Sequence, residues 1–308
     1  MNLRKLLRFG AALVLVVLMA VGAIYAWPLG LDEGAARPVS FTEAQARVAQ
    51  AVARDEADPA VTTGCRTRAL VHPGRAAKAV LMLHGYTECP AQFSSLAQQY
   101  YDQGYNVFVP RAPRHGVTDP EAHAGLHADE LLAYASESWD SAAGLGDEVG
   151  VVGISGGAVL ATWLTVHRPV VRLLALSPFY APSATQAPAW QVKPVIVLYG
   201  NRLLPDHFNS SGLSYAALSQ YLRIARNLDG EPSPTLKSVG LVVSPADTFI
   251  DLDRAASVTS SLGPSNSFVV PAEWGIGHDV ADPAELGNHV ATLQQTYFDL
   301  YEGRAVAL

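Results

Sequence analysis

Short apolar runs alternate with longer stretches of helical periodicity through most of the chain after residue 65. The apolar runs predict strands, and the stretches between them predict helices. Strands are expected at 66–72, 79–85, 106–110, 149–153, 171–177, 240–244 and 267–270, and helices near 91–103 and 251–262 and at 129–143, 156–167 and 284–302. This alternation is typical of an α/β fold with a mainly parallel sheet covered by helices on both faces. In such a sheet the functional site lies at the carboxyl ends of the strands.

Residues 178–237 interrupt this rhythm. They carry apolar and aromatic side chains, including Trp190, between proline-rich breaks. That composition suits a lid over an apolar pocket. The alternative is a packed subdomain that only shields the interior from water.

The N-terminal residues follow a different pattern. Arg4, Lys5 and Arg8 precede an uncharged apolar run of 19 residues, from Phe9 to Trp27. A membrane span needs about 20 residues, whereas the core of a signal peptide is typically about 7–15 residues long. We therefore expect residues 1–27 to form a signal anchor or transmembrane segment, with its basic side in the cytoplasm and the rest of the chain outside, in the periplasm or extracellular space. A signal that is cleaved, leaving a secreted protein, is the alternative.

Residues 28–39 read as a short proline- and glycine-containing linker. An amphipathic helix is expected from Ser40, because Ser40 and Glu43 fit a capping box. The remainder, 40–308, is expected to be one domain, since a chain of 308 residues that is 49% apolar can build one large core.

Charge and cysteine content narrow the function classes. Acidic residues outnumber basic ones by 28 to 21, for a net charge of −7, which argues against a nucleic-acid partner. The two cysteines, Cys65 and Cys89, would both lie in an oxidising compartment and could form a disulfide. Two buried free thiols are the alternative, and two cysteines alone do not predict a zinc site.

The stretch "GISGG" places Ser155 between a predicted strand and a predicted helix. One interpretation is a glycine-rich turn in which the serine caps the helix. The other is a nucleophile elbow, G-x-S-x-G, which holds the serine hydroxyl above the sheet on a sharp strand-to-helix turn. The strand before and the helix after are the context that the elbow requires.

Two further polar side chains follow predicted strands. Asp247 lies three residues after the strand at 240–244, and His278 lies in a glycine-flanked loop after the last strand. The chain order serine, aspartate, histidine is that of the α/β-hydrolases. The segments "LMLHGYT", "GYNVFVPRAPRHG", "GISGG", "DTFID" and "GIGHDV" together resemble an α/β-hydrolase of the carboxylesterase and monoacylglycerol-lipase kind, over about residues 65–300. The resemblance implies that 178–237 is the cap inserted in this family.

The chemistry of these side chains suggests their roles. Ser155 would attack a carbonyl, His278 would take its proton, and Asp247 would orient the imidazole and stabilise its charged form. Asp251 and Asp253 compete for the role of the acid, but both suit the first turn of the next helix.

The family pattern also implies an oxyanion hole made by the backbone N–H groups of Tyr86 and Gly156. The absence of a bulky residue after the serine predicts room beside the acyl group. The resemblance implies a small residue or an asparagine where this chain has Glu88. Its carboxylate either disfavours anionic substrates or, as we favour, points to solvent.

The remaining histidines are expected to have other roles. The resemblance implies structural positions for His84 and His115 in their turns. His123 and His127 are four residues apart and could be half of a metal site, but no further ligands are evident, and we expect no metal. Asp279 is expected to cap or solvate its own loop.

The sequence therefore predicts a serine hydrolase that cleaves carboxylic esters through an acyl-enzyme, without a cofactor. Uncharged short-to-medium acyl esters, including monoacylglycerols, suit the apolar insertion. A thioesterase, acyltransferase, amidase or peptidase on the same fold is an alternative, because the same three residues serve all of them. A non-catalytic binding protein of the cell envelope is a more remote one. The sequence leaves the oligomeric state open.

Overall fold

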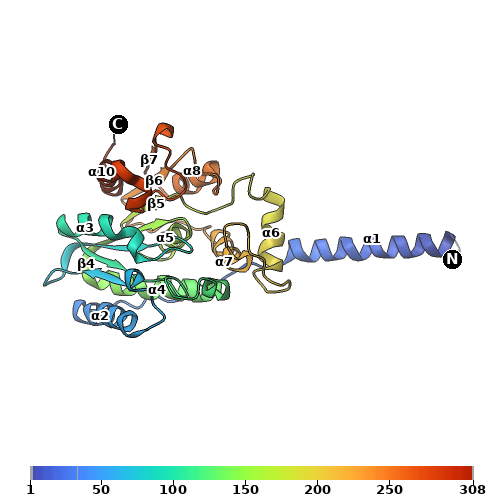
Figure 1. Ribbon diagram of the computed structural model, residues 1–308, viewed down its shortest axis with the longest axis horizontal. Coiled ribbons are helices and arrows are strands. Elements are labelled where there is room, and N and C mark those ends of the chain that lie inside the picture. The colour runs from blue at the N-terminus through green and yellow to red at the C-terminus, as the bar shows by residue number, and fades with distance from the viewer. Residues whose placement is uncertain (1–2, 33, 307–308) are drawn as a thin grey trace.

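The computed structural model describes residues 3–32 and 34–306 (Figure 1). The outermost residues of the expected anchor and domain, 1–2 and 307–308, and residue 33 of the expected linker lie outside the described residues.

A seven-stranded sheet forms the centre of the domain, in the order β1-β3-β2-β4-β5-β6-β7. Its strands are β1 (Arg68–Leu70), β2 (Ala76–Leu83), β3 (Asn106–Val109), β4 (Gly146–Ile154), β5 (Arg172–Leu176), β6 (Ser238–Val243) and β7 (Ser265–Val269). Only β1 is antiparallel to its neighbour, and the other pairs are parallel. The predicted mainly parallel sheet is confirmed.

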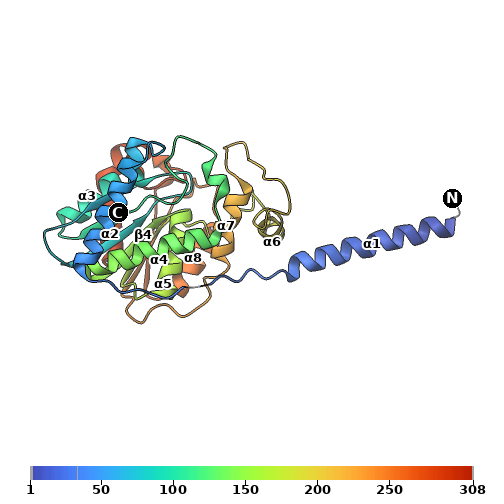
Figure 2. The same ribbon diagram turned by 90° about the horizontal axis from the view of Figure 1, so that it is seen from below.

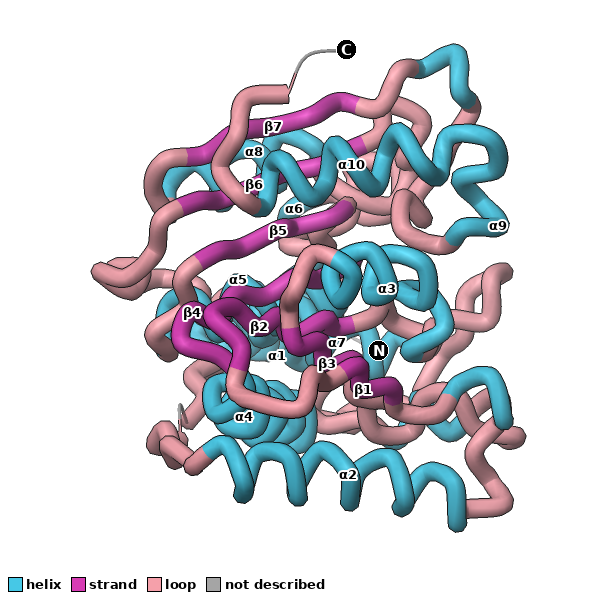
Figure 3. The backbone as a smooth tube through the Cα atoms, turned by 90° about the vertical axis from the view of Figure 1, so that its left-hand side faces the viewer, coloured by secondary structure: helices cyan, strands magenta, loops and turns pink. Residues whose placement is uncertain are grey.

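Helices cover both faces of this sheet because successive strand side chains point to opposite sides. Leu81 and Leu83 of β2 belong to the buried cluster that includes side chains of α4, α5 and α8, whereas Val80 and Met82 belong to the cluster that includes side chains of α3 and α10. Figure 3 shows α2 lying outside α4. The helices around the sheet are α2 (Phe41–Ala57), α3 (Ser94–Asp102), α4 (Ala128–Leu145), α5 (Gly156–His167), α8 (Leu252–Ser261), α9 (Pro283–Leu286) and α10 (Val290–Tyr301). Short 3-10 turns are η1 (Thr63–Cys65), η2 (Pro90–Phe93), η3 (Ala122–Gly125), η4 (Ala272–Trp274) and η5 (Gly287–His289).

The prediction of a single helix over 284–302 is wrong. The chain forms α9, then η5, then α10. Gly287 lies where α9 ends and has a φ of 52°, in the left-handed region that glycine adopts without steric cost. The sequence pattern did not distinguish this break from a continuous helix.

The helix expected from Ser40 is present as α2. The Ser40 hydroxyl accepts a hydrogen bond from the Glu43 backbone N–H. The Glu43 carboxylate pairs with Arg47 at 2.6 Å, so of the expected capping box the structure has the serine half.

The insertion contributes two helices, α6 (Ala189–Leu198) and α7 (Tyr215–Ala225). They lie at the end of the domain from which α1 (Leu3–Ala26) extends (Figures 1 and 2). Within the described residues, Leu7–Ala26 is the one helical segment long and apolar enough to cross a bilayer, and none of it is buried against the domain. Length and composition are therefore compatible with an anchor or a signal.

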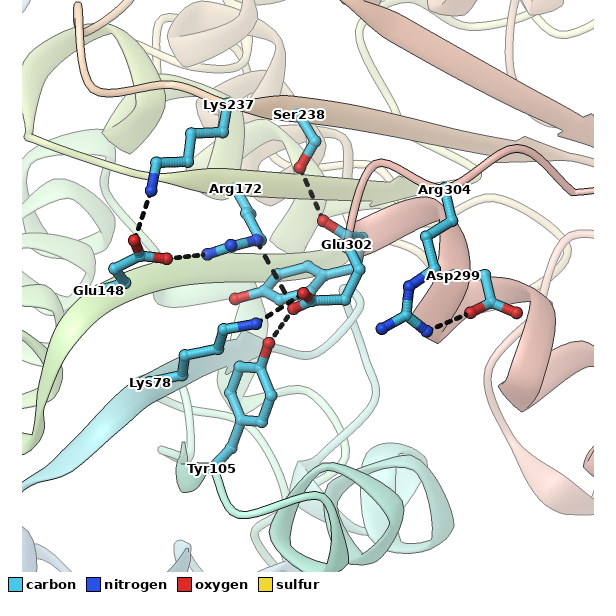
Figure 4. A network of polar contacts seen from close by, with 10 residues as sticks. Lys78, Tyr105, Glu148, Arg172, Lys237, Ser238, Asp299, Glu302 and Arg304 are labelled. Carbon is cyan, nitrogen blue, oxygen red and sulfur yellow. Dashed lines mark hydrogen bonds and ion pairs between the residues drawn. The ribbon is translucent and has the colours of Figure 1, made fainter.

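A charged network joins the amino ends of the central strands to the end of α10 (Figure 4). Lys78 of β2 donates to Glu302 at 2.6 Å, and Tyr105 also donates to that carboxylate. Arg172 of β5 lies between Glu302 and Glu148, with an N–O distance of 2.7 Å to Glu148. The network satisfies charges that the sheet would otherwise leave half-buried and alone.

The loss of folding stability at acidic pH should depend on this network. Hydrogen bonds from Lys237 and Arg172 lower the pKa of Glu148 to about 2. Burial alone would raise the pKa of Glu302, but hydrogen bonds from Lys78 and Tyr105 outweigh it and lower that pKa. Carboxyls with a depressed folded-state pKa stabilise the fold above their unfolded pKa of about 4.3 and lose that effect as the pH falls.

We therefore expect Glu148→Gln to cost on the order of 1 kcal/mol at pH 7, a value reduced for solvent screening because the side chain is one-third exposed. Wild type should lose more stability than this variant between pH 5 and pH 3. Urea midpoints at each pH measure the difference, with Glu273→Gln at an exposed site as control. Identical pH dependence in wild type and Glu148→Gln would contradict the expectation.

Candidate active site

Ser155 stands on a strained turn between β4 and α5. Its φ of 52° and ψ of −118° lie outside the regions that non-glycine residues normally adopt. A Cβ at Gly153 would come within 2.5 Å of the Gly157 carbonyl oxygen, and one at Gly157 would overlap the carbonyl of Leu83. Both flanking glycines are thus required by the tightness of the turn, as an elbow demands.

The structure brings Ser155, His278 and Asp247 together. The Ser155 Oγ lies 2.8 Å from His278 Nε2, and His278 Nδ1 lies 2.6 Å from Asp247 Oδ2. The Asp247 side chain is fully buried, and its Oδ1 accepts hydrogen bonds from the backbone N–H groups of Phe249 and Ile250. One carboxylate oxygen is therefore held by the backbone, which leaves the other for the imidazole.

The competing acids lie elsewhere. Asp251 is the N-cap of α8, and its Oδ1 accepts from the Arg254 N–H at 2.9 Å. Asp253 lies in the first turn of the same helix. Both have the helix-start positions that the sequence suggested.

The loop after β2 passes against the nucleophile. A Cβ at Gly85 would lie 3.7 Å from the Ser155 Cβ, and the Gly85 N–H donates to Gln92 Oε1 at 2.8 Å. Tyr86 follows in this loop, and Gly156 is the first residue of α5, where a backbone N–H has no intrahelical acceptor. Of the two residues expected to form the oxyanion hole, Gly156 thus follows Ser155 directly, and Tyr86 follows the glycine that lies against Ser155.

A cavity of about 290 Å³ opens at Ser155 and His278. Its apolar lining comes from both the domain and the insertion: Tyr86, Ile154, Phe179, Leu213, Leu218 and Phe249. Larger hollows of about 670 and 810 Å³ lie along α4, bordered by α2 and by the linker, and include neither Ser155 nor His278.

The space beside Gly156 itself is filled, whereas the room expected beside the acyl group stays a prediction. A Cβ at Gly156 would lie 2.8 Å from the Tyr221 ring, which α7 of the insertion places there. Gly156 therefore has no side chain because Tyr221 occupies the space. Tyr221 also packs against Tyr86 with ring centroids 5.5 Å apart, and the Tyr86 hydroxyl accepts from the Ser214 N–H at 3.2 Å. These contacts, which the sequence pattern did not reveal, fix the insertion to the loop after β2.

The favoured expectation that Glu88 points to solvent is wrong. It is half-buried and lines the cavity. Burial and, next, the charge of Asp279 raise the pKa of the Glu88 carboxyl. Asp279 accepts from the Ala281 and Asp282 N–H groups, so it caps its own loop as expected, and it also accepts from Gln92 at 2.7 Å.

His84 and His115 have the structural positions implied by the resemblance. The His84 ring donates from Nδ1 to the Gly85 carbonyl and accepts at Nε2 from the Ala112 N–H, both at 2.9 Å. Both ring nitrogens are used only if the ring is neutral, and burial lowers its pKa to about 3. Burial likewise lowers the pKa of His115 to about 4.

The histidine pair four residues apart is divided between two environments. His123 packs edge-on against Tyr86 at 5.1 Å, and His127 precedes the first residue of α4. Within residues 3–32 and 34–306, no group of three or more histidine, cysteine, aspartate or glutamate side chains could hold a metal ion.

Cys65 and Cys89 form a disulfide. It ties the segment before β1 to the loop that carries Tyr86 and Glu88. Gly116 packs directly on it, since a Cβ there would lie 2.5 Å from the Cys65 Cβ. The bond therefore restrains one wall of the cavity.

No protein-family model matches the chain. Among curated proteins, the chain is similar to the thermostable monoacylglycerol lipase of Bacillus sp. strain H-257, with 27% identity over 222 residues, 70% of this chain and 83% of the relative. Among solved structures, the monoacylglycerol lipase of Paleococcus ferrophilus aligns with a TM-score of 0.59 at 18% identity, over 77% of this chain and 98% of the other. The protein has the α/β-hydrolase fold.

A second structure agrees with this fold. A soluble variant of the monoglyceride lipase from Saccharomyces cerevisiae, solved with a substrate analogue, aligns with a TM-score of 0.56 at 10% identity, over 79% of this chain and 92% of the other. The α/β-hydrolase fold expected from the sequence is thus confirmed. The curated relative supports the expected carboxylic ester hydrolase.

Proposed function

We propose that this α/β-hydrolase cleaves uncharged carboxylic esters through an acyl-enzyme on Ser155. The observation that carries the proposal is the unbroken chain of hydrogen bonds from Ser155 Oγ through the His278 ring to the buried Asp247 carboxylate. A turn that served only to cap a helix would need no imidazole at the serine hydroxyl.

The reaction proceeds in two halves. His278 Nε2 takes the hydroxyl proton as Ser155 attacks the ester carbonyl, and the imidazolium then gives that proton to the departing alcohol. Water, activated by the same ring, hydrolyses the acyl-enzyme. The Asp247 carboxylate keeps the proton on Nδ1 and stabilises the imidazolium without itself being protonated.

The backbone N–H groups of Tyr86 and Gly156 stabilise the oxyanion in both tetrahedral intermediates. Such preorganised donors stabilise the transition state by about 2.7–4 kcal/mol each. The disulfide at Cys89 and the Tyr86–Ser214 hydrogen bond support this arrangement, because both restrain the loop.

The cavity supports a neutral acyl group of short to medium length. Its volume is at the lower end of small-molecule sites, and most of its lining is apolar. Glu88 and Asp279 add two carboxyl groups to the lining, which disfavour a substrate with its own negative charge. Monoacylglycerols satisfy both conditions, and the curated relative is a monoacylglycerol lipase.

We also propose that α1 anchors the protein in a membrane with the hydrolase outside the cytoplasm. Its length and hydropathy suit a span, and Arg4, Lys5 and Arg8 favour the cytoplasmic side for its N-terminus.

Hydrolysis of p-nitrophenyl esters from acetate to laurate tests the proposed activity. We expect the fastest turnover at short or medium acyl length and slower hydrolysis of a succinate half-ester than of the butyrate ester of similar size. Glu88→Gln should narrow that difference, whereas Glu121→Gln, an exposed acid that does not line the cavity, should leave it unchanged. Failure to hydrolyse any chain length would refute ester hydrolysis.

A further inference from the structure

The insertion is attached to the base of α1, far away in sequence. The Tyr25 hydroxyl donates to the Trp190 carbonyl at 2.6 Å, and the Lys193 ammonium donates to the Tyr25 carbonyl. Just after α1, the Arg223 guanidinium donates to the carbonyls of Leu29 and Gly30. Both insertion helices therefore hold the chain where it leaves α1. The domain is thus attached to α1 by side-chain contacts as well as by the linker.

This attachment fixes the direction of α6. The helix lies crosswise to α1 at the end of the domain from which α1 extends (Figures 1 and 2). If α1 crosses a bilayer, α6 runs along the surface of that bilayer. A helix in this orientation binds a lipid surface through apolar and aromatic side chains.

Apolar side chains are exposed at both ends of α6. Trp190 is 65% exposed at its start, and Leu203 and Leu204 are 54% and 42% exposed just beyond its end. The Leu203 and Leu204 N–H groups both donate to the Leu198 carbonyl, which keeps the pair folded against the end of the helix. Among the described residues after Trp27, the only other exposed large apolar side chain is Val269, on β7.

The same segment leads to the cavity. Ser211 and Leu213, a few residues beyond Leu204, line the cavity at Ser155. The segment that follows Leu203 and Leu204 therefore forms part of the cavity wall.

We propose that Trp190, Leu203 and Leu204, here called the α6 patch, insert into the outer lipid surface of the bilayer that α1 spans, and that ester substrates enter the cavity from that surface. The proposal rests on the proposed ester hydrolysis and on the membrane anchor. Its occupant is a lipid surface, because Trp190 adjoins Tyr25 at the end of the helix that we propose to span the membrane.

The first test uses the full chain reconstituted in vesicles of 1-palmitoyl-2-oleoylphosphatidylcholine. The triple variant Trp190→Ser, Leu203→Ser, Leu204→Ser is compared with wild type on two esters, the medium-chain monodecanoylglycerol dissolved in the vesicles and water-soluble p-nitrophenyl butyrate. The contact with Tyr25 uses the Trp190 backbone, so the variant keeps it. We expect kcat/KM for the vesicle ester to fall at least about tenfold, and that for the soluble ester to stay within about twofold. Val269→Ser, which removes an equally exposed apolar group on β7, should change neither.

The second test is independent of activity. Trp27 lies at the end of the proposed span and would also be near lipid, so this test uses a Trp27→Phe background. Brominated phosphatidylcholine in the vesicles should quench part of the tryptophan fluorescence of that variant, and adding Trp190→Phe should abolish the quenching. Without Trp190 quenching, and with a triple variant as active as wild type on the vesicle ester, the docking is overturned while ester hydrolysis stands. If wild type hydrolyses neither ester, the proposed function fails, and quenching still decides the docking. A detergent-solubilised dimer that the triple variant abolishes would assign the α6 patch to a second copy of this chain and overturn the proposal.

Discussion

Replacing Ser155 by alanine should lower kcat for ester hydrolysis by at least about 10⁴-fold. The substitution removes the only atom that forms the acyl-enzyme, and the remaining cavity and oxyanion donors cannot replace it. The fold should be retained, because alanine has the same steric cost as serine at a φ of 52°. We would measure kcat with p-nitrophenyl butyrate, labelling by a fluorophosphonate, and the thermal midpoint. Activity and labelling should both vanish while the midpoint stays within a few degrees.

Ser177 provides a matched control. It follows β5, the neighbour of β4, and also has a positive φ, 39°. Its buried Oγ is among the described side-chain atoms that have no hydrogen-bond partner. Ser177→Ala should therefore keep both activity and labelling. Hydrolysis that survived in Ser155→Ala would place the chemistry elsewhere and return "GISGG" to a simple turn.

The second large effect is expected at Asp247. Asparagine can keep its amide oxygen on the N–H groups of Phe249 and Ile250, which hold Oδ1 in the wild type. The amide NH₂ then faces His278 Nδ1 and favours the tautomer with the proton on Nε2, toward Ser155. That nitrogen can no longer accept the serine proton, so Asp247→Asn should lower kcat about 10³- to 10⁴-fold with little loss of stability.

Asp251→Asn tests the competing assignment. Asparagine is as good an N-cap as aspartate, so α8 should keep its start. We expect kcat within about twofold of wild type, measured on the same ester. If Asp251→Asn were the inactive variant and Asp247→Asn the active one, Asp251 would be the acid of the site.

Much of the fold could be predicted because the pattern of a buried parallel sheet is local. The α5 helix begins and ends at the residues that the sequence indicated, 156–167, because an apolar strand and two glycines define its start. The site could be approached in the same way. Ser155, Asp247 and His278 each follow a strand, and parallel strands bring their carboxyl ends to one edge.

What the sequence missed depends on contacts between distant segments. Nothing near Gly156 indicates that Tyr221, 65 positions later, fills the space beside it. The loop that carries Glu88 is held by the disulfide, which the sequence allowed, and by the Tyr86 hydrogen bond to Ser214, 128 positions away, which it did not reveal. The break at Gly287 is different, since glycine is tolerated inside a helix or ends one, and only the packing around it decides.

The spread of the site along the chain has a consequence for folding kinetics. Ser155 and His278 are separated by 123 positions, and His278 and Asp247 by 31. Their loops meet at one edge of the sheet only when β4, β5, β6 and β7 have paired, and such long-range closure is slow compared with local helix formation. Recovery of a reactive serine therefore marks the last stage of refolding rather than the early hydrophobic collapse of the chain. A partly assembled sheet with α5 already formed would contain Ser155 but not His278 beside it. Such an intermediate would not react with a fluorophosphonate.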